Sequence, residues 1–388
     1  MQCIILKANE VDGIVFNLAD LAQYLNQLTD RRDNRGKVYD LGTILSMIVL
    51  ARLSGQDKPY GIFEWIKNRQ EALATIFSLK RKRTPCLNTL RTILGKVVSL
   101  DELEQALRHY LHLRYGGQSS VFICIDGKTM RGTIPKEYTQ GVHLLSAYLA
   151  EDGIVLKQVA VESKENEISA SGPLLDELYL KDKVVCADAL HTQRAFCVQI
   201  LSSGGAYLLF AKKNQSTLLA DIKQFFVPPR QATGWHITHL PRTVATWKNK
   251  SHGRIERRTL TLIADDDRFV DWPGLVQVFK LERYTKKLTT GVETSEIVYG
   301  LTSCAVHKAD ASQVLAWTRL YWQIENGVHH RRDVTLQEDA TRIAKPPLAQ
   351  AISIINNFVI GLVNKLGYAN LASARRYFDA SIAVQMFQ

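Results

Sequence analysis

Apolar side chains recur at helical spacing through the first 115 residues of the chain. Residues 41–53 (LGTILSMIVLARL) are apolar nearly all round, as in a buried helix. Residues 63–79 show an amphipathic helical pattern, and two further helical stretches follow at 84–100 and 101–115. The pattern therefore predicts an all-α N-terminal domain over residues 1–115.

The hydrophobic period changes near residue 118. Residues 119–126 (SSVFICID) form a β-branched apolar run that ends in Asp-Gly, and 143–163 contains two more strands joined at Glu-Asp-Gly. A helix, a short buried strand (182–190), a second helix and a strand (206–215) follow. This order of strand, strand, strand, helix, strand, helix, strand is typical of a ribonuclease-H-like α/β core, in which helices cover both faces of a mixed sheet.

Short strands dominate the next part of the chain, from about 216 to 305. The apolar runs predict them at 235–240, 257–264, 276–284 and 296–303. Because the helical pattern resumes at residue 311, this segment is interpreted as a β-rich insertion into the core and not as a separate domain. Residues 311–333 predict one long helix, and the end of the chain is mostly helical. The second domain is thus expected to cover 116–388.

Charge and cysteine usage narrow the class of protein. The chain carries 49 Lys and Arg against 38 Asp and Glu, a net charge of +11, which favours a polyanionic partner such as nucleic acid. Basic proteins without a nucleic-acid role also exist, so charge alone leaves this open. The 6 cysteines lack any CxxC pair, which fits a reducing compartment. With no signal peptide in the N-terminal sequence and 41–53 as the longest apolar stretch noted, a cytoplasmic protein is expected.

Three carboxylates are candidates for metal chemistry. Asp126 and Asp188 each end a buried apolar strand, and Glu325 lies within the helical stretch 311–333, where Trp322, Ile324 and Val328 would pack inward. A carboxylate in such a place is costly unless a cation offsets it, and hard divalent cations prefer oxygen ligands. Three carboxylates can hold two metal ions that act on a phosphodiester. Taken singly, each aspartate is also explained as a turn former or helix cap.

Longer motifs decide between these interpretations. The segments ICIDGKTMRGT, DALHTQ, AKKNQ, SHGRIERR, WPGLVQV and YWQIENGVHHRRDVTLQEDATRI together resemble the ISAs-type (H-repeat-associated) DDE transposases of bacterial insertion sequences. The resemblance covers nearly the whole chain, including the helical front section. It implies that Asp126, Asp188 and Glu325 are the three catalytic acids, with Mg²⁺ or Mn²⁺ as the metal. It also implies a ribonuclease-H-like core and action on the terminal inverted repeats of the element.

Several polar residues near these acids are candidates for DNA contact. They are Lys128, Arg131, His191, Lys212, Lys213, Asn214, Arg319, Asn326, His329 and Arg332. Some of them have a structural alternative: surface solvation for Lys128 and Arg131, a cap of the next helix for His191, and an ion pair with Asp333 or Glu338 for Arg319 or Arg332. Arg254 and Glu256 are expected to pair with each other. Trp247, Trp272 and Trp322 are interpreted as core residues and not as platforms for bases.

The predicted reaction is phosphoryl transfer on double-stranded DNA, with two metal ions at the acids. Water first cuts at the end of the element, and the freed 3′-hydroxyl then attacks target DNA. Since two ends must be joined in concert, a homodimer or larger assembly is expected. Two alternatives remain open: a ribonuclease-H-like nuclease or resolvase that cuts without joining, and an inactive, domesticated DNA-binding protein.

Overall fold

A computed structural model describes residues 5–7, 15–115, 121–134, 141–161, 167–227 and 240–387. The chain divides into two compact units, neither of which is one continuous stretch. The first unit contains Met1–Ser120, Gly127–Lys164 and Glu325–Gln388, and the second contains Val121–Asp126 and Glu165–Ile324. The fold is a mixed α/β architecture with a helical N-terminal region, as the sequence predicts.

Helices from both ends of the chain build the core of the first unit. From the N-terminal region come α1 (Leu18–Leu25), α2 (Leu41–Leu53), α3 (Pro59–Asn68), α4 (Gln70–Ile76), α5 (Leu87–Thr92) and α6 (Leu100–Tyr115). From the C-terminal region come α11 (Pro346–Lys365) and α12 (Leu371–Phe387). Every residue of α2 is buried, which agrees with its apolar sequence, and α11 packs against α2 and α6. One apolar cluster therefore joins residues that lie some 300 positions apart.

The expected all-α region also contains two short strands, β1 (Ile5–Lys7) and β2 (Val15–Asn17). They pair antiparallel, with Leu6 opposite Phe16. Each strand has only 3 residues, which is less than one helical turn. The few apolar residues in each strand are therefore too few to form the apolar stripe of an amphipathic helix. The prediction of a purely helical front section is wrong at this point.

One described helix is long and apolar enough to cross a membrane by length and composition. This is α11, a longer apolar element than the stretch 41–53 that the sequence suggested as the longest. In the structure, 83% of its apolar window is buried inside the protein. Its hydrophobicity is thus accounted for by packing against α2, α6 and β5.

A hairpin completes the first unit. Strands β4 (His143–Leu149) and β5 (Ile154–Val161) pair antiparallel, as the Glu-Asp-Gly sequence between them predicts. Gly153 has a φ of +70°, and a side chain there would meet the Asn364 amide, which donates a hydrogen bond to the Gly153 carbonyl oxygen. The turn therefore requires glycine both for its backbone conformation and for its contact with α11.

Parallel strands form the centre of the second unit. They are β3 (Phe122–Thr129), β6 (Val184–Ala187) and β7 (Ala206–Ala211), and β3 continues into the first unit, where β4 is its neighbour. Helices α7 (Glu167–Asp176) and α8 (Arg194–Ser202) lie between these strands in the chain. The chain order from β3 to β7 is therefore the ribonuclease-H-like order that the sequence predicts.

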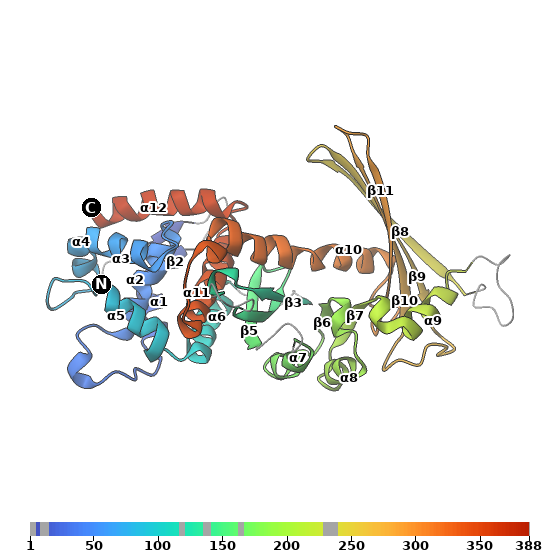
Figure 1. Ribbon diagram of the computed structural model, residues 1–388, viewed down its shortest axis with the longest axis horizontal. Helices are drawn as coiled ribbons and strands as arrows, with labels where there is room; N and C mark the ends of the chain where they lie inside the picture. Colours follow the sequence, from blue (N-terminus) through green and yellow to red (C-terminus); the bar gives the residue numbers. More distant parts are fainter. Residues whose placement is uncertain are drawn as a thin grey trace. The chain divides into compact units, whose positions relative to one another are not determined.

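Four antiparallel strands extend the same sheet beyond β7. They are β8 (Arg242–Ser251), β9 (Arg254–Ala264), β10 (Gln277–Lys287) and β11 (Glu293–Thr302), in the spatial order β7-β11-β10-β9-β8 (Figure 1). Leu301 of β11 pairs with Leu209 of β7, so the β-rich segment continues the sheet of the core, as expected of an insertion. This segment is preceded by a helix, α9 (Ser216–Gln224), inside the range predicted to be β-rich. Of the strand expected at 235–240, residues 235–239 lie outside the described part of the chain.

The long helix predicted for 311–333 is broken. Helix α10 (Ala311–Tyr321) has Trp322 as its C-cap, and two π-helical turns follow at Glu325–His329 and Arg331–Thr335. Ile324 and Val328 are buried as expected, but the Trp322 side chain is 43% exposed, contrary to prediction. The α-helix ends before Trp322, and the π-helical turns that follow are wider than α-helical turns. The direction in which each side chain points therefore no longer follows a period of 3.6 residues.

Candidate active site

Asp126 and Asp188 lie on or directly after neighbouring, parallel strands of the second unit. The last residues that pair between β3 and β6 are Ile125 and Ala187; Asp126 is the next residue within β3, and Asp188 directly follows β6. Asp126 was expected to end its strand, but β3 continues to Thr129. The four residues before each aspartate are buried, whereas both aspartates are partly exposed. The apolar strands thus fix two carboxylates at the same edge of the sheet, which is where α/β folds place their functional groups.

The hydroxyl of Tyr321 lies within electrostatic range of both aspartates. Tyr321 ends α10, is 9% exposed and contacts the ring of Phe210 with centroids 5.6 Å apart. Burial raises the pKa of its hydroxyl well above the ordinary value, and the charges of Asp126 and Asp188 add to this. Both carboxylates therefore act on one phenol. The sequence did not single out Tyr321, although its place four residues before Glu325 was a usable signal.

Asp188 also has the capping role that was its structural alternative. Its Oδ1 accepts a hydrogen bond of 2.5 Å from the backbone N–H of Leu190, at the start of a 3₁₀ turn. A carboxylate has two oxygens with about four lone-pair positions, so this bond is compatible with a second role as a metal ligand. The capping bond therefore orients the Asp188 carboxylate at the end of β6.

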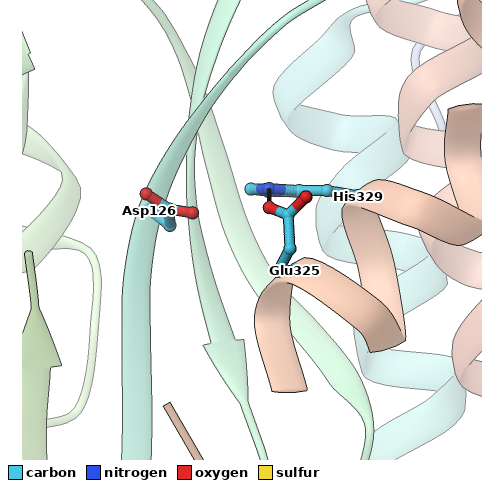
Figure 2. Close-up of side chains that lie close together, drawn as sticks. All are labelled: Asp126, Glu325 and His329. Carbon is cyan, nitrogen blue, oxygen red and sulfur yellow. Dashed lines mark hydrogen bonds and ion pairs between the residues drawn. The ribbon is translucent and has the colours of Figure 1, made fainter. Parts of the chain in front are cut away.

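Glu325 and His329 form a pair in the first unit, one π-helical turn apart. Nδ1 of His329 lies 3.4 Å from Oε2 of Glu325, and Figure 2 draws this contact as a dashed line. The hydrogen bond from His329 holds the pKa of Glu325 below its ordinary value, and the charges of His329, Lys128 and His330 add to this against the effect of burial. Glu325 is therefore a carboxylate at neutral pH, and its side chain is 58% exposed.

Within the first unit, Glu325 and His329 offer a carboxylate and an imidazole as candidate metal ligands (Figure 2), and within the second unit Asp126 offers a further carboxylate. Carboxylate oxygens suit Mg²⁺ and Mn²⁺, and a neutral imidazole nitrogen is a ligand for several transition metals. His329 was expected as a DNA contact, yet its side chain is only 5% exposed and its ring is engaged with Glu325.

Lys128 was expected to reach DNA phosphates, but its ammonium group is used inside the protein. Its Nζ lies 2.5 Å from a carboxylate oxygen of Asp333 and 3.6 Å from one of Asp339, and its side chain is 5% exposed. Burial raises the pKa of Asp333 against the opposing effect of Lys128. Arg131 differs, because its side chain is exposed while its backbone N–H donates to Asp339 Oδ1. The structure thus leaves Arg131, and not Lys128, facing solvent.

Arg332 is fully buried, contrary to its expected role at the DNA. Its guanidinium donates to the carboxylate of Glu338, with Nη2 and Oε2 2.7 Å apart and no exposure of either side chain. Burial alone would raise the pKa of Glu338, yet Arg332 holds it below the ordinary value. The amide of Asn356 donates to the other oxygen of Glu338, and Arg52 of α2 donates to that same Asn356. The ion pair with Glu338, which was the structural alternative, is the arrangement found.

His191 is also buried, at 2% exposure. Its Nε2 lies 3.5 Å from a carboxylate oxygen of Glu167, and its ring contacts that of Phe196. The structural alternative, a cap of the next helix, is not found, because Gln193 precedes α8 and makes no side-chain capping bond; His191 itself ends the 3₁₀ turn Ala189–His191, which Asp188 caps. A buried imidazole beside a buried carboxylate is placed to brace α7 against this turn, and in this structure it does not face solvent.

The loop after β7 presents polar groups at the same sheet edge as the aspartates. Lys212, Lys213 and Asn214 are all exposed, and β7 is the parallel neighbour of β6. The amide of Asn214 donates a bond of 2.7 Å to the carbonyl of Ala189, the residue after Asp188. This loop is therefore fixed beside Asp188, with two lysines free to meet solvent.

Arg319 and Trp247 lie against each other on the extended sheet, whereas Trp272 contacts Cys197 and Arg194 of α8. The Arg319 guanidinium stacks 3.8 Å from the centre of the Trp247 ring. Trp247 and Trp272 are partly exposed and Trp322 is exposed, so the expectation of three core tryptophans is wrong for Trp322 and only partly met for the others. Asn326 is exposed.

The proposed pairing within the segment SHGRIERR is confirmed by the structure. Nε of Arg254 lies 2.8 Å from Oε1 of Glu256, near the turn between β8 and β9. Half of the Arg254 side chain is exposed, so this pair adds little to stability.

Comparison with known proteins gives the class to which this fold and these acids belong. The family described as "Transposase DDE domain" matches residues 117–361, and that described as "DDE_Tnp_1-associated" matches residues 22–111. The protein is a DDE-type transposase. More particularly, the chain belongs to the transposase family of the DDE_Tnp_1 domain, which covers more than half of its length.

Individual relatives agree with this assignment. The candidate transposase YncI of Escherichia coli O157:H7 is 29% identical over 354 residues, covering 89% of this chain and 88% of YncI. The H-repeat-associated candidate transposase YhhI of Escherichia coli K12 is 24% identical over 353 residues, covering 89% and 90%. An uncharacterized protein from the dhlA 3′ region of Xanthobacter autotrophicus is 30% identical over 259 residues, covering 65% and 84%. The predicted H-repeat-associated family is thereby confirmed.

Among solved structures, the chain resembles a piggyBac transposase in a synaptic complex with hairpin DNA. The TM-score is 0.43 with 11% sequence identity, and the match covers 95% of this chain and 78% of the other.

Proposed function

We propose that this transposase binds the terminal inverted repeats of an insertion sequence, cuts the DNA there and joins the ends to target DNA. The observation that carries the proposal is the pairing of β3 with β6, which sets Asp126 and Asp188 side by side at one sheet edge. Two carboxylates on neighbouring strands, directly after the last residues that pair, are an arrangement suited to bind divalent cations, and both act on Tyr321.

Glu325 is the third acid of the proposal. The chain passes between the two units directly after Asp126 and directly before Glu325. Both acids are therefore at points where the polypeptide itself links the units. Glu325 is ionised, half-exposed and oriented by His329, as a metal ligand needs to be.

The cofactor proposed for this site is a pair of Mg²⁺ or Mn²⁺ ions, held by Asp126, Asp188 and Glu325. The three acids offer hard oxygen ligands, which both ions prefer. Mn²⁺ accepts an imidazole nitrogen such as that of His329 more readily than Mg²⁺ does. When bound, such ions stabilise the charge that develops on the attacking and leaving oxygens of a phosphodiester.

Residues of this chain would hold the DNA during the reaction. Lys212 and Lys213, which are exposed at the sheet edge of the second unit, would neutralise phosphates, and Asn214 can bond to a phosphate oxygen. Arg131, exposed in the first unit, is a further candidate for phosphate contact. Hydrolysis frees a 3′-hydroxyl, which then displaces a 3′ oxygen of the target strand, so one phosphodiester forms as another breaks.

The remaining expectations belong to the same proposal. Residues 1–115 would form a DNA-binding associated domain and 116–388 the catalytic domain. The protein would act in the cytoplasm on double-stranded DNA, as a homodimer or larger assembly that holds two ends together. Its positive charge of +11 supports a polyanionic partner.

A strand-transfer assay tests the proposal. Purified protein is incubated with a labelled duplex that contains the DNA flanking its reading frame, together with a supercoiled target plasmid. Joined product is expected with Mg²⁺ or Mn²⁺ and none with EDTA. Cutting without joining would instead indicate a nuclease or resolvase, and metal-independent binding without cutting would indicate an inactive DNA-binding protein.

A further inference from the structure

One face of the extended sheet carries a row of arginine and tryptophan side chains. Trp247 of β8 is paired with Arg258 of β9, and Arg258 is paired with Arg283 of β10. Residues directly opposite each other on adjacent strands project from the same face of a sheet. The three side chains therefore form one continuous row across β8, β9 and β10.

Helix α10 packs on β8 and β9 over this row and adds two more side chains. The guanidinium carbons of Arg319 and Arg258 lie 3.8 Å and 5.8 Å from the centre of the same Trp247 ring. The Arg283 guanidinium lies 5.1 Å from the ring of Trp322. We call Arg258, Arg283 and Arg319 the arginine cluster. The indole rings of Trp247 and Trp322 hold the three guanidinium groups by cation–π contact.

The positive charge of the cluster exceeds the negative charge that faces it. Arg283 pairs with Glu296 at 3.3 Å, but that carboxylate is 64% exposed and such a pair is weak. Glu256, on the same strand as Arg258, pairs with Arg254. Within the part of the chain that the structure describes, neither Arg258 nor Arg319 has an ion pair of its own.

Partial burial makes this surplus charge costly. Burial lowers the pKa of Arg258, and the charges of Arg283 and Arg319 lower it further, against the effect of Glu256. Burial likewise lowers the pKa of Arg283, with Glu296 opposing. Guanidinium groups that repel one another beside indole rings are stabilised by an added anion, and a phosphate accepts two parallel hydrogen bonds from arginine.

Two side chains, Trp322 and Tyr321, connect the arginine cluster to the aspartates of the same unit. Trp322, which contacts Arg283, lies edge-on to Tyr321 with ring centroids 6.3 Å apart. Tyr321 in turn is the residue on which Asp126 and Asp188 act. A strand held at the cluster would therefore lie next to the candidate catalytic acids.

We propose that Arg258, Arg283 and Arg319 form a phosphate-binding subsite that holds the DNA backbone beside the acids, an inference that rests on the proposed function. The ligand class is the phosphodiester backbone, bound by planar guanidinium forks that lysine reproduces poorly. Trp247 and Trp322 form the apolar walls of the subsite, which strengthen these contacts by reducing access of water.

The test compares two double variants with equal loss of charge. Arg258→Gln with Arg319→Gln removes the two unpaired members of the cluster. Lys248→Gln with Arg257→Gln is the matched control, because these two residues are paired on the opposite face of the same strands β8 and β9. Binding of a labelled duplex is measured without divalent metal, between about 50 and 200 mM salt.

The log–log slope of affinity against salt is expected to fall in magnitude by about 1.8 in the cluster variant, since each phosphate contact contributes about 0.9. The control is expected to keep the wild-type slope to within about half of that change. A cluster variant that keeps the wild-type slope, or a control that loses as much, overturns the inference. If the wild-type protein binds no duplex at all, the proposed function as a DNA-binding transposase fails. That result differs from a failure of the phosphate-binding subsite alone.

A conservative pair guards against loss of folding. If the Gln variant melts early, Arg258→Lys with Arg319→Lys is measured instead, since it keeps both charges and the apolar stems. It is expected to keep the salt slope but bind several-fold more weakly, because lysine cannot form the two-pronged bond. Unchanged affinity in this variant would overturn the inference.

Discussion

Arg332 and Glu338 form an ion pair of 2.7 Å in which neither side chain has any exposure to solvent. The pair joins the segment that follows Glu325 to Asn356 of α11, and through Asn356 to Arg52 of α2. This chain of buried polar groups connects the segment that bears Glu325 to the helical core of the first unit.

Breaking this pair is expected to destabilise the protein. Arg332→Met leaves the Glu338 carboxylate buried and unpaired, which should lower the free energy of unfolding by roughly 3–5 kcal/mol. Arg332→Met with Glu338→Leu should recover most of the loss, and Arg342→Met, at an exposed position, should have little effect. Urea denaturation of the three variants checks this. A single variant as stable as wild type would show that the pair is not a structural element.

The three acids are expected to be needed for cutting but not for binding. Asp126→Asn, Asp188→Asn and Glu325→Gln each remove a metal ligand while keeping the side-chain shape, so cleavage should fall to background with duplex affinity retained. Asp271→Asn is the control, because its carboxylate is 95% exposed and lies in the same unit as the aspartates. Cleavage at the wild-type rate in any of the three would remove that residue from the site.

Stability is expected to fall as pH rises from about 4 to about 7 because of Glu104. This residue of α6 is 7% exposed, and burial raises its pKa to about 7 although Lys157 lies 3.4 Å away. A folded-state pKa above the unfolded value of about 4.3 means that the folded protein binds the extra proton. The contribution is thus complete below about pH 4 and lost by about pH 7, an effect on the order of 3 kcal/mol.

The measurement for Glu104 is the free energy of unfolding at pH 5 and pH 8. The difference between the two should shrink in Glu104→Gln, which keeps the acceptor for the Gln158 N–H, and should persist in Glu71→Gln, at an exposed position. Equal pH dependence in wild type and Glu104→Gln would contradict the prediction.

The basic run of Lys80, Arg81, Lys82 and Arg83 is expected to contact DNA phosphates. All four residues are exposed. Wild-type binding should show a salt slope of roughly −4 to −8, as for five to nine neutralised phosphates, and replacing the four residues by Gln should reduce its magnitude by about 2–4. Fluorescence anisotropy over a salt series provides the slopes. If the variant keeps the wild-type slope, this loop is a solvated surface only.

The neighbouring positions of Asp126 and Asp188 could be predicted from the sequence, because each follows a short, wholly apolar run. Such runs are buried on both faces, as in parallel strands, and parallel strands end at a common edge. Strands β9, β10 and β11 of the β-rich insertion could also be predicted, because each contains an apolar run. Strand β8 was missed because most of its residues are exposed, so its sequence shows no apolar pattern.

The roles of the basic residues could not be predicted in the same way. Helical spacing placed Arg332 on a flank of Glu325, but the π-helical turns change that geometry. Lys128 and Arg332 both find partners in residues 333–339, contacts set by how this segment folds back. The positions of Arg258 and Arg283 depend on strand register, which a single sequence with an unrecognised β8 does not determine.

The order in which the chain is synthesised matters for the helical core of the first unit. Helices α2 and α6 emerge from the ribosome early, yet α11 fills the space between them and is made after residue 345. The N-terminal helices therefore wait with apolar surface uncovered while the whole second unit is translated, a period of tens of seconds at bacterial rates. A premature stop or frameshift before α11 would leave Ile48, Leu111 and their neighbours without a partner, so truncated products should be targets for chaperones and proteases.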